Sequence, residues 1–320
     1  MDPLVRSAAV ERLRGISFLG ILSPRYANIP GNPIYKRPTV KTSSFEKDGS
    51  REDHSINVAK LALHICRALR LTEEQQRYAA AWGLLHDIGN WPLSHTAQQA
   101  FSEILDVNTK TVREWIVTND QRAPRKYFVA DELNECGIDP NRLLLLFRKI
   151  PDKGLQPVSD IFRSKITPDM LDGIWRSAKS FGVEAFDLDR FRGALCHDLA
   201  DNYIIHPDYH KEAERFWRIK RNIYNRFFSS KSAVQFESRW SLAVKNYFGG
   251  SSVTFEQSLE MNEEKLVKEI ASRVPSKSND IYRWKAPVKQ RIKRPIPKDL
   301  TIESLDNVFI EESVSLDEYK

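Results

Sequence analysis

The chain has 320 residues, of which 41% are hydrophobic, and its formal net charge is +6. This composition excludes a disordered protein, and the length allows one large domain or two modest ones. The small positive charge is compatible with an anionic ligand but does not by itself indicate nucleic-acid binding.

The cysteines and the apolar segments indicate the cellular compartment. Cys66, Cys136 and Cys196 are too few and too widely spaced for a disulfide framework. The N-terminal segment is interrupted by charges, unlike a secretory signal, and no apolar run approaches the roughly 18 residues of a membrane span. We therefore expect a soluble cytoplasmic protein with no membrane segment.

Hydrophobic spacing predicts helices along most of the chain. The first is a short helix over residues 4–15, followed by irregular structure over 22–53. His54 to Leu71 has strong helical spacing, and Thr72 is the predicted N-cap of a helix that runs to His86. The Thr-Pro pair at 167–168 predicts the start of another helix, which stops at Gly182. Further helices are predicted at about 95–105, 108–118, 130–135, 140–149, 188–205, 209–229, 232–247 and 255–273.

The order of these elements predicts a mainly α fold. The chain shows no β-α-β alternation and no Gly-rich phosphate loop, which argues against Rossmann and P-loop folds. Residues 276–298 are basic and contain three prolines, and the last twenty residues are acidic. We expect a domain over 1–250 and, over 251–320, a C-terminal helix followed by an extended or β-hairpin appendage.

Four side chains at predicted helix ends form a candidate metal site. His54 opens one helix, His86 and Asp87 close the next, and Asp169 lies in the first turn of a later one. Because a short turn near Leu71 joins the first two helices, they are antiparallel, and His54 and His86 lie at the same end of the bundle. Two imidazoles and two carboxylates suit a divalent ion such as Mn, Mg, Fe, Ni, Co or Zn.

This pattern, H…HD…D, resembles the signature of the HD-domain metal-dependent phosphohydrolases. The surrounding sequence is similar to the deoxynucleotide triphosphohydrolases, which include the bacterial dGTPase-like enzymes and the animal SAM-and-HD-domain enzyme. Residues 51–55 (REDHS), 84–95 (LLHDIGNWPLSH) and 166–172 (ITPDMLD) carry the resemblance, which covers about residues 10–250. It implies an HD-domain helical bundle whose metal ligands are His54, His86, Asp87 and Asp169.

The resemblance also implies roles for neighbouring residues. Arg51 contacts or braces a phosphate, His95 acts as a general acid or phosphate contact, and Asp87 bridges the roles of ligand and base. Basic residues that contact phosphate in the family correspond to Lys220, Arg221 and Arg226, for which a charged, solvated helix face is an equal alternative. Asp172 is interpreted as a structural acid one turn beyond Asp169.

Three departures from the family pattern lie on the helix that begins near Asp169. The family's Lys, Tyr and acid are replaced by Met170, Gly173 and Ser177. We therefore expect hydrolysis of a phosphate ester or anhydride in a nucleotide-like substrate, with an altered substrate pocket.

Two alternatives remain open. One is a phosphodiesterase or nuclease that binds DNA or RNA through the basic 276–298 segment. The other is a non-catalytic HD scaffold that senses a nucleotide or binds a partner protein. The sequence leaves open whether identical chains associate.

Overall fold

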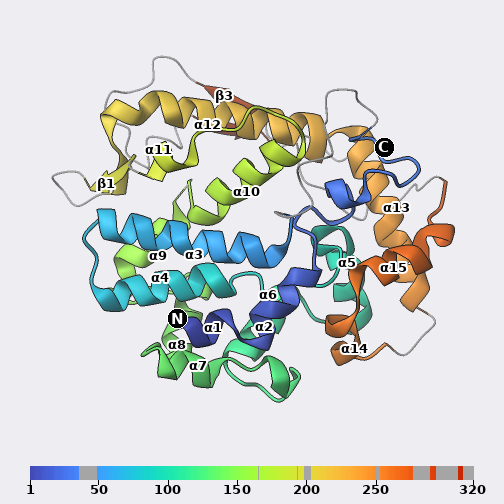
Figure 1. Ribbon diagram of the computed structural model, residues 1–320, viewed down its shortest axis with the longest axis horizontal. Coiled ribbons are helices and arrows are strands. Elements are labelled where there is room, and N and C mark those ends of the chain that lie inside the picture. The colour runs from blue at the N-terminus through green and yellow to red at the C-terminus, as the bar shows by residue number, and fades with distance from the viewer. Residues whose placement is uncertain are drawn as a thin grey trace.

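The architecture is almost entirely helical, as the hydrophobic spacing predicts (Figure 1). The computed structural model describes residues 1–35, 49–164, 166–192, 194–197, 203–249, 253–276, 289–292 and 309–312. Among these residues the strands form two-stranded antiparallel pairs, and no larger sheet is present. The mainly α fold class is therefore confirmed.

Two antiparallel helices, α3 (Arg51–Ala68) and α4 (Glu73–Leu85), form the centre of the fold. Ser50 caps α3 by accepting a hydrogen bond from the Asp53 amide, and Thr72 caps α4 in a capping box with Gln75. The helices approach closely because Gly83 lacks a side chain: a Cβ there would lie 2.7 Å from the Ala59 Cα. This close packing fixes the positions of the residues at the ends of both helices.

A third helix, α10 (Pro168–Ser180), packs on the opposite side of α3 from α4 (Figure 1). Thr167 caps it by accepting from the Met170 amide, and Pro168 occupies its first turn, as the sequence predicted. The prediction of a stop near Gly182 is also confirmed, since Gly182 follows the C-cap residue Phe181 and has a φ of 64°, which is typical of glycine after a helix. The start of α10 therefore lies beside the start of α3.

Further helices surround this central layer. α5 to α8 follow the prediction within one or two residues, and α9 adds a helix that the sequence did not predict. Their bounds are α5 (Ser94–Leu105), α6 (Thr109–Val117), α7 (Ala130–Glu135), α8 (Pro140–Arg148) and α9 (Gln156–Arg163). After α10 come α11 (Leu188–Arg192), α12 (His210–Ile223), α13 (Lys231–Phe248), α14 (Phe255–Glu260) and α15 (Glu263–Ile270).

Three predicted helices are wrong in extent. Residues 4–15 form α1 (Asp2–Val5), α2 (Ala8–Glu11) and a 3-10 turn, because the Ser7 hydroxyl donates to the Leu4 carbonyl and ends the first piece. Within 188–205 the described residues form α11 and then an antiparallel pair of β1 (Leu195–His197) with β2 (Tyr203–Ile205), since the β-branched pair at 204–205 favours strand. Residues 255–273 divide into α14 and α15, because Asn262 caps a new helix.

The helix predicted over 209–229 changes its winding near the end. α12 stops at Ile223, and residues Tyr224–Phe228 continue as a π-helical turn. Such turns widen the helix and alter the direction of the side chains that they carry, and they occur frequently at functional sites.

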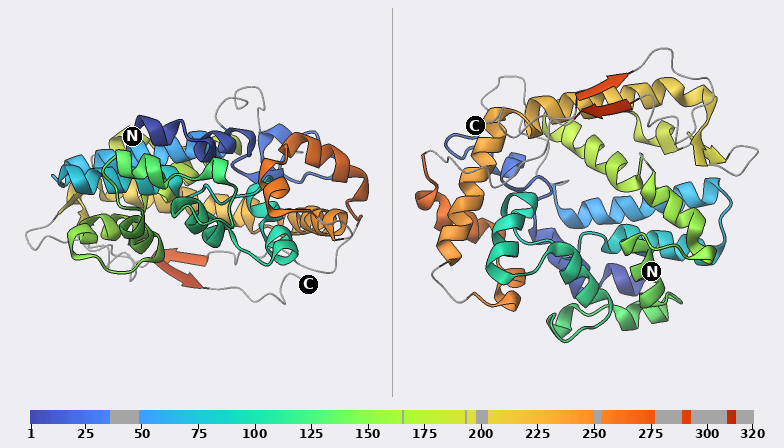
Figure 2. Two further views of the ribbon diagram at one scale, coloured as in Figure 1. Left: turned by 90° about the horizontal axis from the view of Figure 1, so that it is seen from below. Right: turned by 180° about the vertical axis from the view of Figure 1, so that it is seen from behind.

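The hydrophobic core continues across the boundary predicted at residue 250. Leu259, Leu266 and Ile270 belong to the same buried cluster as the central helices, and α13, α14 and α15 gather beside α5 at one end of the molecule (Figures 1 and 2). In the C-terminal appendage β3 (Lys289–Ile292) pairs with β4 (Phe309–Glu312). The rest of the basic 276–298 run lies outside the described residues, apart from its first residue.

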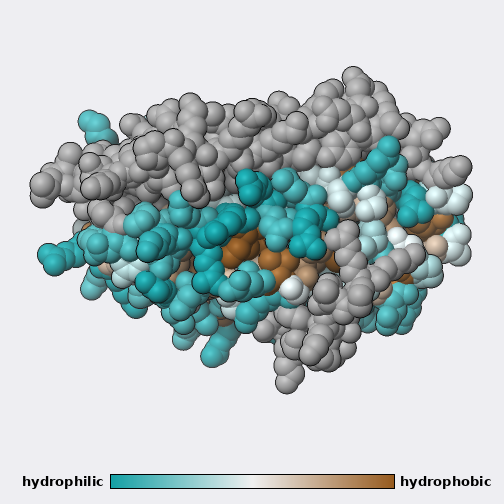
Figure 3. All heavy atoms as spheres, turned by 90° about the horizontal axis from the view of Figure 1, so that it is seen from above, coloured by the Kyte–Doolittle hydropathy of each residue, from teal (hydrophilic) through white to brown (hydrophobic). Residues whose placement is uncertain are grey.

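On the face seen from above, the described residues are mainly hydrophilic, with hydrophobic residues visible near the centre and toward the right edge (Figure 3). Within the described ranges no helix combines the length and the apolar composition needed to cross a membrane.

Candidate active site

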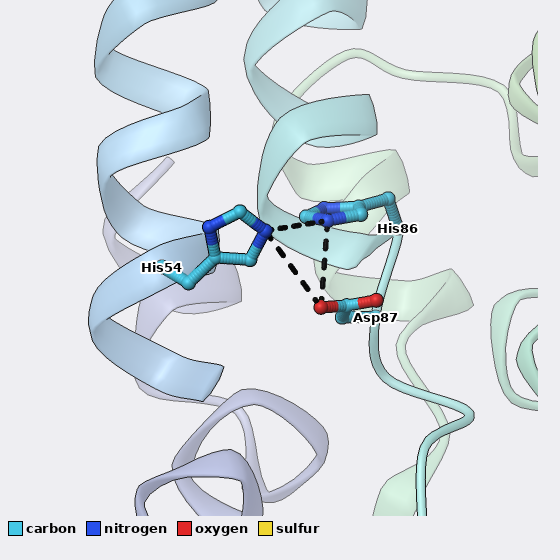
Figure 4. Close-up of side chains that lie close together, drawn as sticks. All are labelled: His54, His86 and Asp87. Atoms are coloured by element: carbon cyan, nitrogen blue, oxygen red, sulfur yellow. Dashed lines mark hydrogen bonds and ion pairs between the residues drawn. The ribbon is translucent and has the colours of Figure 1, made fainter. Parts of the chain in front are cut away.

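Three helix ends bring the predicted metal ligands together. His54 lies in the first turn of α3 and is fully buried, His86 is the C-cap residue of α4, Asp87 follows it, and Asp169 lies in the first turn of α10. Figure 4 shows the rings of His54 and His86 and the carboxylate of Asp87 pointing toward one another.

The distances between ligand atoms match the spacing around a single ion. The two histidine Nε2 atoms are 3.3 Å apart, and Asp87 Oδ2 lies 3.9 Å from that of His54 and 3.5 Å from that of His86. Asp169 Oδ1 lies 3.1 Å and 3.7 Å from the same two nitrogens. Ligands about 2.0–2.2 Å from one metal ion lie about 3–4 Å apart, so these contacts fit a shared ion. Asp169 is the loosest member, since the group whose ligand atoms all lie within 4.8 Å of one another contains only His54, His86 and Asp87.

The hydrogen bonds of both histidines leave their Nε2 atoms available for a cation. His54 Nδ1 lies 2.6 Å from Asp172 Oδ2, and His86 Nδ1 lies 2.7 Å from the Gly83 carbonyl oxygen. Both partners accept hydrogen bonds, so both Nδ1 atoms donate, and in the neutral rings each Nε2 carries a lone pair. Two lone pairs and two carboxylate oxygens then face one another. These groups repel one another, and a positive ion between them would remove the repulsion. Asp172 is also placed as the acceptor that usually bonds to the other ring nitrogen of a metal-bound histidine.

The charges around the site favour the same conclusion. Burial disfavours a charged His54, but its hydrogen bonds with Asp169 and Asp172 outweigh burial and raise the pKa of His54 to about 9. Without a metal ion, a proton on His54 Nε2 therefore supplies the positive charge beside these carboxylates, and a bound ion would replace that proton. Burial likewise raises the pKa of Asp87, but Arg51 and the two imidazoles outweigh it and hold that pKa well below its usual range. The carboxylates are therefore ionised at neutral pH and attract a positive charge.

A cavity of about 300 Å³ opens beside these ligands. Its volume lies at the small end of the range for ligand pockets, which begins at about 300 Å³. Arg51, Asp87, His95 and Asp169 line it, so four of the predicted site residues share one space. The other residues of its wall are Phe18, Leu19, Thr167, Met170, Gly173, Ile174, Ser177, Tyr224 and Phe228.

Arg51 links the metal ligands to this cavity. Its side chain is only 3% exposed, its Nε donates to Ser94 Oγ at 3.0 Å, and its Nη1 donates to Asp87 Oδ2 at 2.6 Å. Its Nη2 is buried and has no hydrogen-bond partner among the described residues. Arg51 lines the cavity, and a buried guanidinium nitrogen is costly without an acceptor, so this group is suited to an anionic oxygen of a ligand.

The basic residues of α12 and the turn after it do not line the cavity, although Lys220 Nζ lies 5.8 Å from the ring centroid of Tyr224, which does. Lys220 is buried with its Nζ 4.5 Å from the Trp217 ring centroid, and Arg226 packs over the Phe227 ring. Arg221 lines a separate groove on α12 with Arg215 and Arg218. None of the three predicted basic residues is part of the cavity wall. The face that α12 and its π-helical turn present to the cavity carries Tyr224 and Phe228 instead.

Several contributing residues were not predicted. Arg12 Nη2 donates to the Ile88 carbonyl at 2.6 Å, and Arg113 Nη1 donates to the His86 carbonyl at 3.0 Å, so two half-buried arginines hold the backbone on both sides of Asp87. Burial lowers the pKa of each to about 10, which leaves both charged at neutral pH. Arg12 belongs to a segment that resembles the family, but Arg113 carries no local signal in the sequence.

Comparisons with known proteins agree with this geometry. Residues 51–121, which contain His54, His86 and Asp87, match the family model of the HD domain. The chain carries an HD domain. A deoxyguanosinetriphosphate triphosphohydrolase-like protein of Rhizobium meliloti is 36% identical over 111 residues, which cover 31% of this chain and 25% of the relative. One of Agrobacterium fabrum is 34% identical over 104 residues, covering 29% and 24%. The HD domain is thus the segment that identifies the chain.

Solved structures share the overall fold over most of the chain. A hypothetical protein from Aquifex aeolicus has a TM-score of 0.64 at 20% identity and covers 83% of this chain and 66% of its own. A phosphohydrolase from Bacteroides thetaiotaomicron has a TM-score of 0.61 at 16% identity, covering 88% and 66%. At these identities the likeness shows the fold alone. The chain spans about a quarter of the length of the curated relatives it matches.

Proposed function

We propose that this HD-domain protein is a metal-dependent phosphohydrolase that cleaves a phosphate ester or anhydride bond in a nucleotide-like substrate. One observation carries the proposal: the Nε2 atoms of two imidazoles and the oxygens of two carboxylates converge at the edge of a cavity that Arg51 lines, and Arg51 Nη2 is buried with no hydrogen-bond partner among the described residues. The names of the relatives, triphosphohydrolase-like protein and phosphohydrolase, support the same class of reaction.

The ligands we propose for the ion are His54, His86, Asp87 and Asp169. A bound divalent ion supplies polarisation of a phosphoryl oxygen and a water molecule of lowered pKa. The ion is divalent because two carboxylates contribute negative charge, and the mixed nitrogen and oxygen set suits Mn, Mg, Fe, Ni, Co or Zn.

The chain's own residues orient the phosphate and the leaving group. Arg51 binds a phosphoryl oxygen through Nη2 while its Nη1 keeps Asp87 in place, and it stabilises negative charge that grows on the phosphoryl group. His95 lies in the cavity wall and is the proposed donor of a proton to the leaving oxygen. Asp172 and the Gly83 carbonyl accept hydrogen bonds from the two Nδ1 atoms, which orients both rings with Nε2 toward the ion.

A substrate screen with Arg51 variants tests the function. Purified protein with Mn, Mg, Ni or Co is mixed with deoxynucleotides, ribonucleotides, cyclic nucleotides and single-stranded nucleic acid, and the products are identified by mass. We expect hydrolysis of at least one nucleotide. Arg51→Ala should lower its turnover by about one to three orders of magnitude, the scale for losing a positioned charge-stabilising donor.

A matched control separates the role of Arg51 from a general loss of charge. The Arg14 side chain is 70% exposed and pairs with Glu52, the residue after Arg51, so Arg14→Ala should leave turnover within about two-fold. If Arg51→Ala does not fold, Arg51→Lys, which keeps the positive charge, is used in its place. Full activity of both Arg51 variants contradicts the proposed role, and cleavage restricted to single-stranded nucleic acid favours a nuclease.

A further inference from the structure

The cavity wall holds few positive charges for a phosphohydrolase. Among the thirteen residues that line it, Arg51 is the one lysine or arginine. Its Nε and Nη1 are already bonded to Ser94 and Asp87, which leaves Nη2 for a ligand. With a divalent ion balanced by Asp87 and Asp169, this wall can neutralise one phosphate group but not a chain of several.

The face of α10 in the wall is apolar. Met170 follows Asp169 directly, and Gly173, Ile174 and Ser177 continue the same face at spacings of three and four residues. The hydroxyl of Ser177 donates to the Gly173 carbonyl at 2.7 Å, so its proton is already committed within the helix. This face therefore offers van der Waals contact rather than bonds to phosphate oxygens.

The π-helical turn adds aromatic rings to the wall. Tyr224 and Phe228 both line the cavity, with ring centroids 5.4 Å apart in an edge-to-face arrangement. Phe18 lines it near the ligands and lies beneath the Arg51 guanidinium, 4.9 Å from its ring centroid. Rings with this spacing accept a further flat, apolar group through stacking or edge contacts.

The cavity combines one cation beside the metal ligands with an apolar and aromatic wall. From this arrangement we infer that the site takes a phosphomonoester, in which one phosphate is joined to an aromatic or other apolar group, and that it discriminates against triphosphates. The inference rests on the proposed phosphohydrolase function. Water attacks phosphorus, the bond from phosphorus to the ester oxygen breaks, and the leaving oxygen takes a proton, so that an alcohol and inorganic phosphate are formed without any change of oxidation state.

Relative rates on matched substrates test the inference. The values of kcat/KM of the full chain with Mn²⁺ are compared for a nucleoside 5′-monophosphate, its triphosphate, p-nitrophenyl phosphate and glycerol phosphate. We expect the monophosphate to exceed the triphosphate by about ten-fold or more, and both ring-bearing monoesters to exceed glycerol phosphate. Equal or faster hydrolysis of the triphosphate overturns the inference but not the proposed function. No hydrolysis of any phosphate compound overturns both.

A lysine placed in the wall provides a direct structural test. Met170→Lys adds a cation beside Asp169 and should shift the ratio of triphosphate to monophosphate kcat/KM upward by about ten-fold. The matched control is Gln99→Lys, which adds the same charge on the exposed face of α5 and should leave the ratio unchanged. A folded Met170→Lys protein with the wild-type ratio contradicts the argument from charge.

The aromatic contribution is tested separately. Phe228→Leu keeps bulk at the π-helical turn, where Phe228 also packs against Phe181, but removes the ring from the cavity. It should raise KM for p-nitrophenyl phosphate several-fold and leave KM for glycerol phosphate within about two-fold. If KM rises equally for both substrates, the Phe228 ring has a structural role and this wall does not bind the aromatic group of the substrate.

Discussion

Replacing Asp172 by Asn removes a charge that no solvent reaches. The Asp172 side chain is fully buried, and its Oδ2 accepts hydrogen bonds from His54 Nδ1 and from Arg176 Nε. Its Oδ1 is buried without a hydrogen-bond partner among the described residues. An asparagine oxygen can take both bonds in the position of Oδ2, but its amide group then replaces Oδ1 with two donors that find no acceptor there. The variant keeps the shape of the contact and loses its charge.

The expected magnitudes follow from these contacts. Changing the residue that supports a metal-bound histidine costs about 10–100-fold in metal affinity, or about 1.4–2.8 kcal/mol. Arg176 is 4% exposed and loses its ionic partner, and breaking a buried ion pair by removing one member costs about 3–5 kcal/mol of stability. The free energy of unfolding should fall by about 3 kcal/mol, the lower end, because the asparagine oxygen still accepts from Arg176.

Calorimetric titration with Mn²⁺ and Ni²⁺ measures the affinity, on samples that circular dichroism shows to be folded, and urea unfolding measures the stability. Asp160→Asn makes the same chemical change at an exposed position of α9 and should alter neither quantity. If folded Asp172→Asn protein binds both ions within two-fold of the wild-type affinity, then Asp172 does not support His54 as a metal ligand.

Two further substitutions probe the scaffold around the site. Gly83→Ala places a Cβ 2.7 Å from the Ala59 Cα and separates the helices that carry His54 and His86, so it should destabilise the protein by about 1–3 kcal/mol and weaken metal binding. Urea unfolding and metal titration measure these two effects, and unchanged stability would contradict the close approach of the helices. The buried Glu263 carboxylate accepts hydrogen bonds from the Leu93 amide at 2.6 Å, the Tyr26 hydroxyl and the Ser17 amide. Glu263→Gln weakens these hydrogen bonds and should lower the free energy of unfolding, measured in urea, by about 2 kcal/mol or more. The same change at its exposed neighbour, Glu264→Gln, should not lower it.

Local signals explain what the sequence could predict. Thr72 and Thr167 bond to amides three residues later in the chain, so the starts of α4 and α10 could be predicted without tertiary information. The position of His54 at the start of α3 and of His86 at the end of α4 followed from the short turn between these helices. The same reasoning placed Asp169 correctly at the start of its helix.

Features that depend on distant contacts could not be predicted. Asp172 contacts His54 across 118 positions, and Glu263 reaches Ser17 across 246. The face of α12 that lies toward the cavity depends on packing against α10, which is why Tyr224 occupies the wall and Arg221 does not. The hairpin within 188–205 was missed because its alternative, a longer helix, has equally plausible hydrophobic spacing.

The contacts of Arg51 explain how the substrate of such a site can change while its chemistry stays the same. Asp87 Oδ2, the oxygen that faces the two imidazoles, also accepts from Arg51 Nη1, so the guanidinium stays beside any ion bound there. A phosphate that contacts the ion therefore also lies near Nη2, whatever is attached to it. Met170, Gly173, Tyr224 and Phe228 make none of these contacts and form the rest of the wall. Substitutions among them change the group attached to the phosphate without disturbing the groups that act on phosphorus. The proposed reaction therefore depends on residues at the ends of α3 and α4 and at the start of α10. The choice of substrate depends on the cavity face of α10 and on the turn after α12.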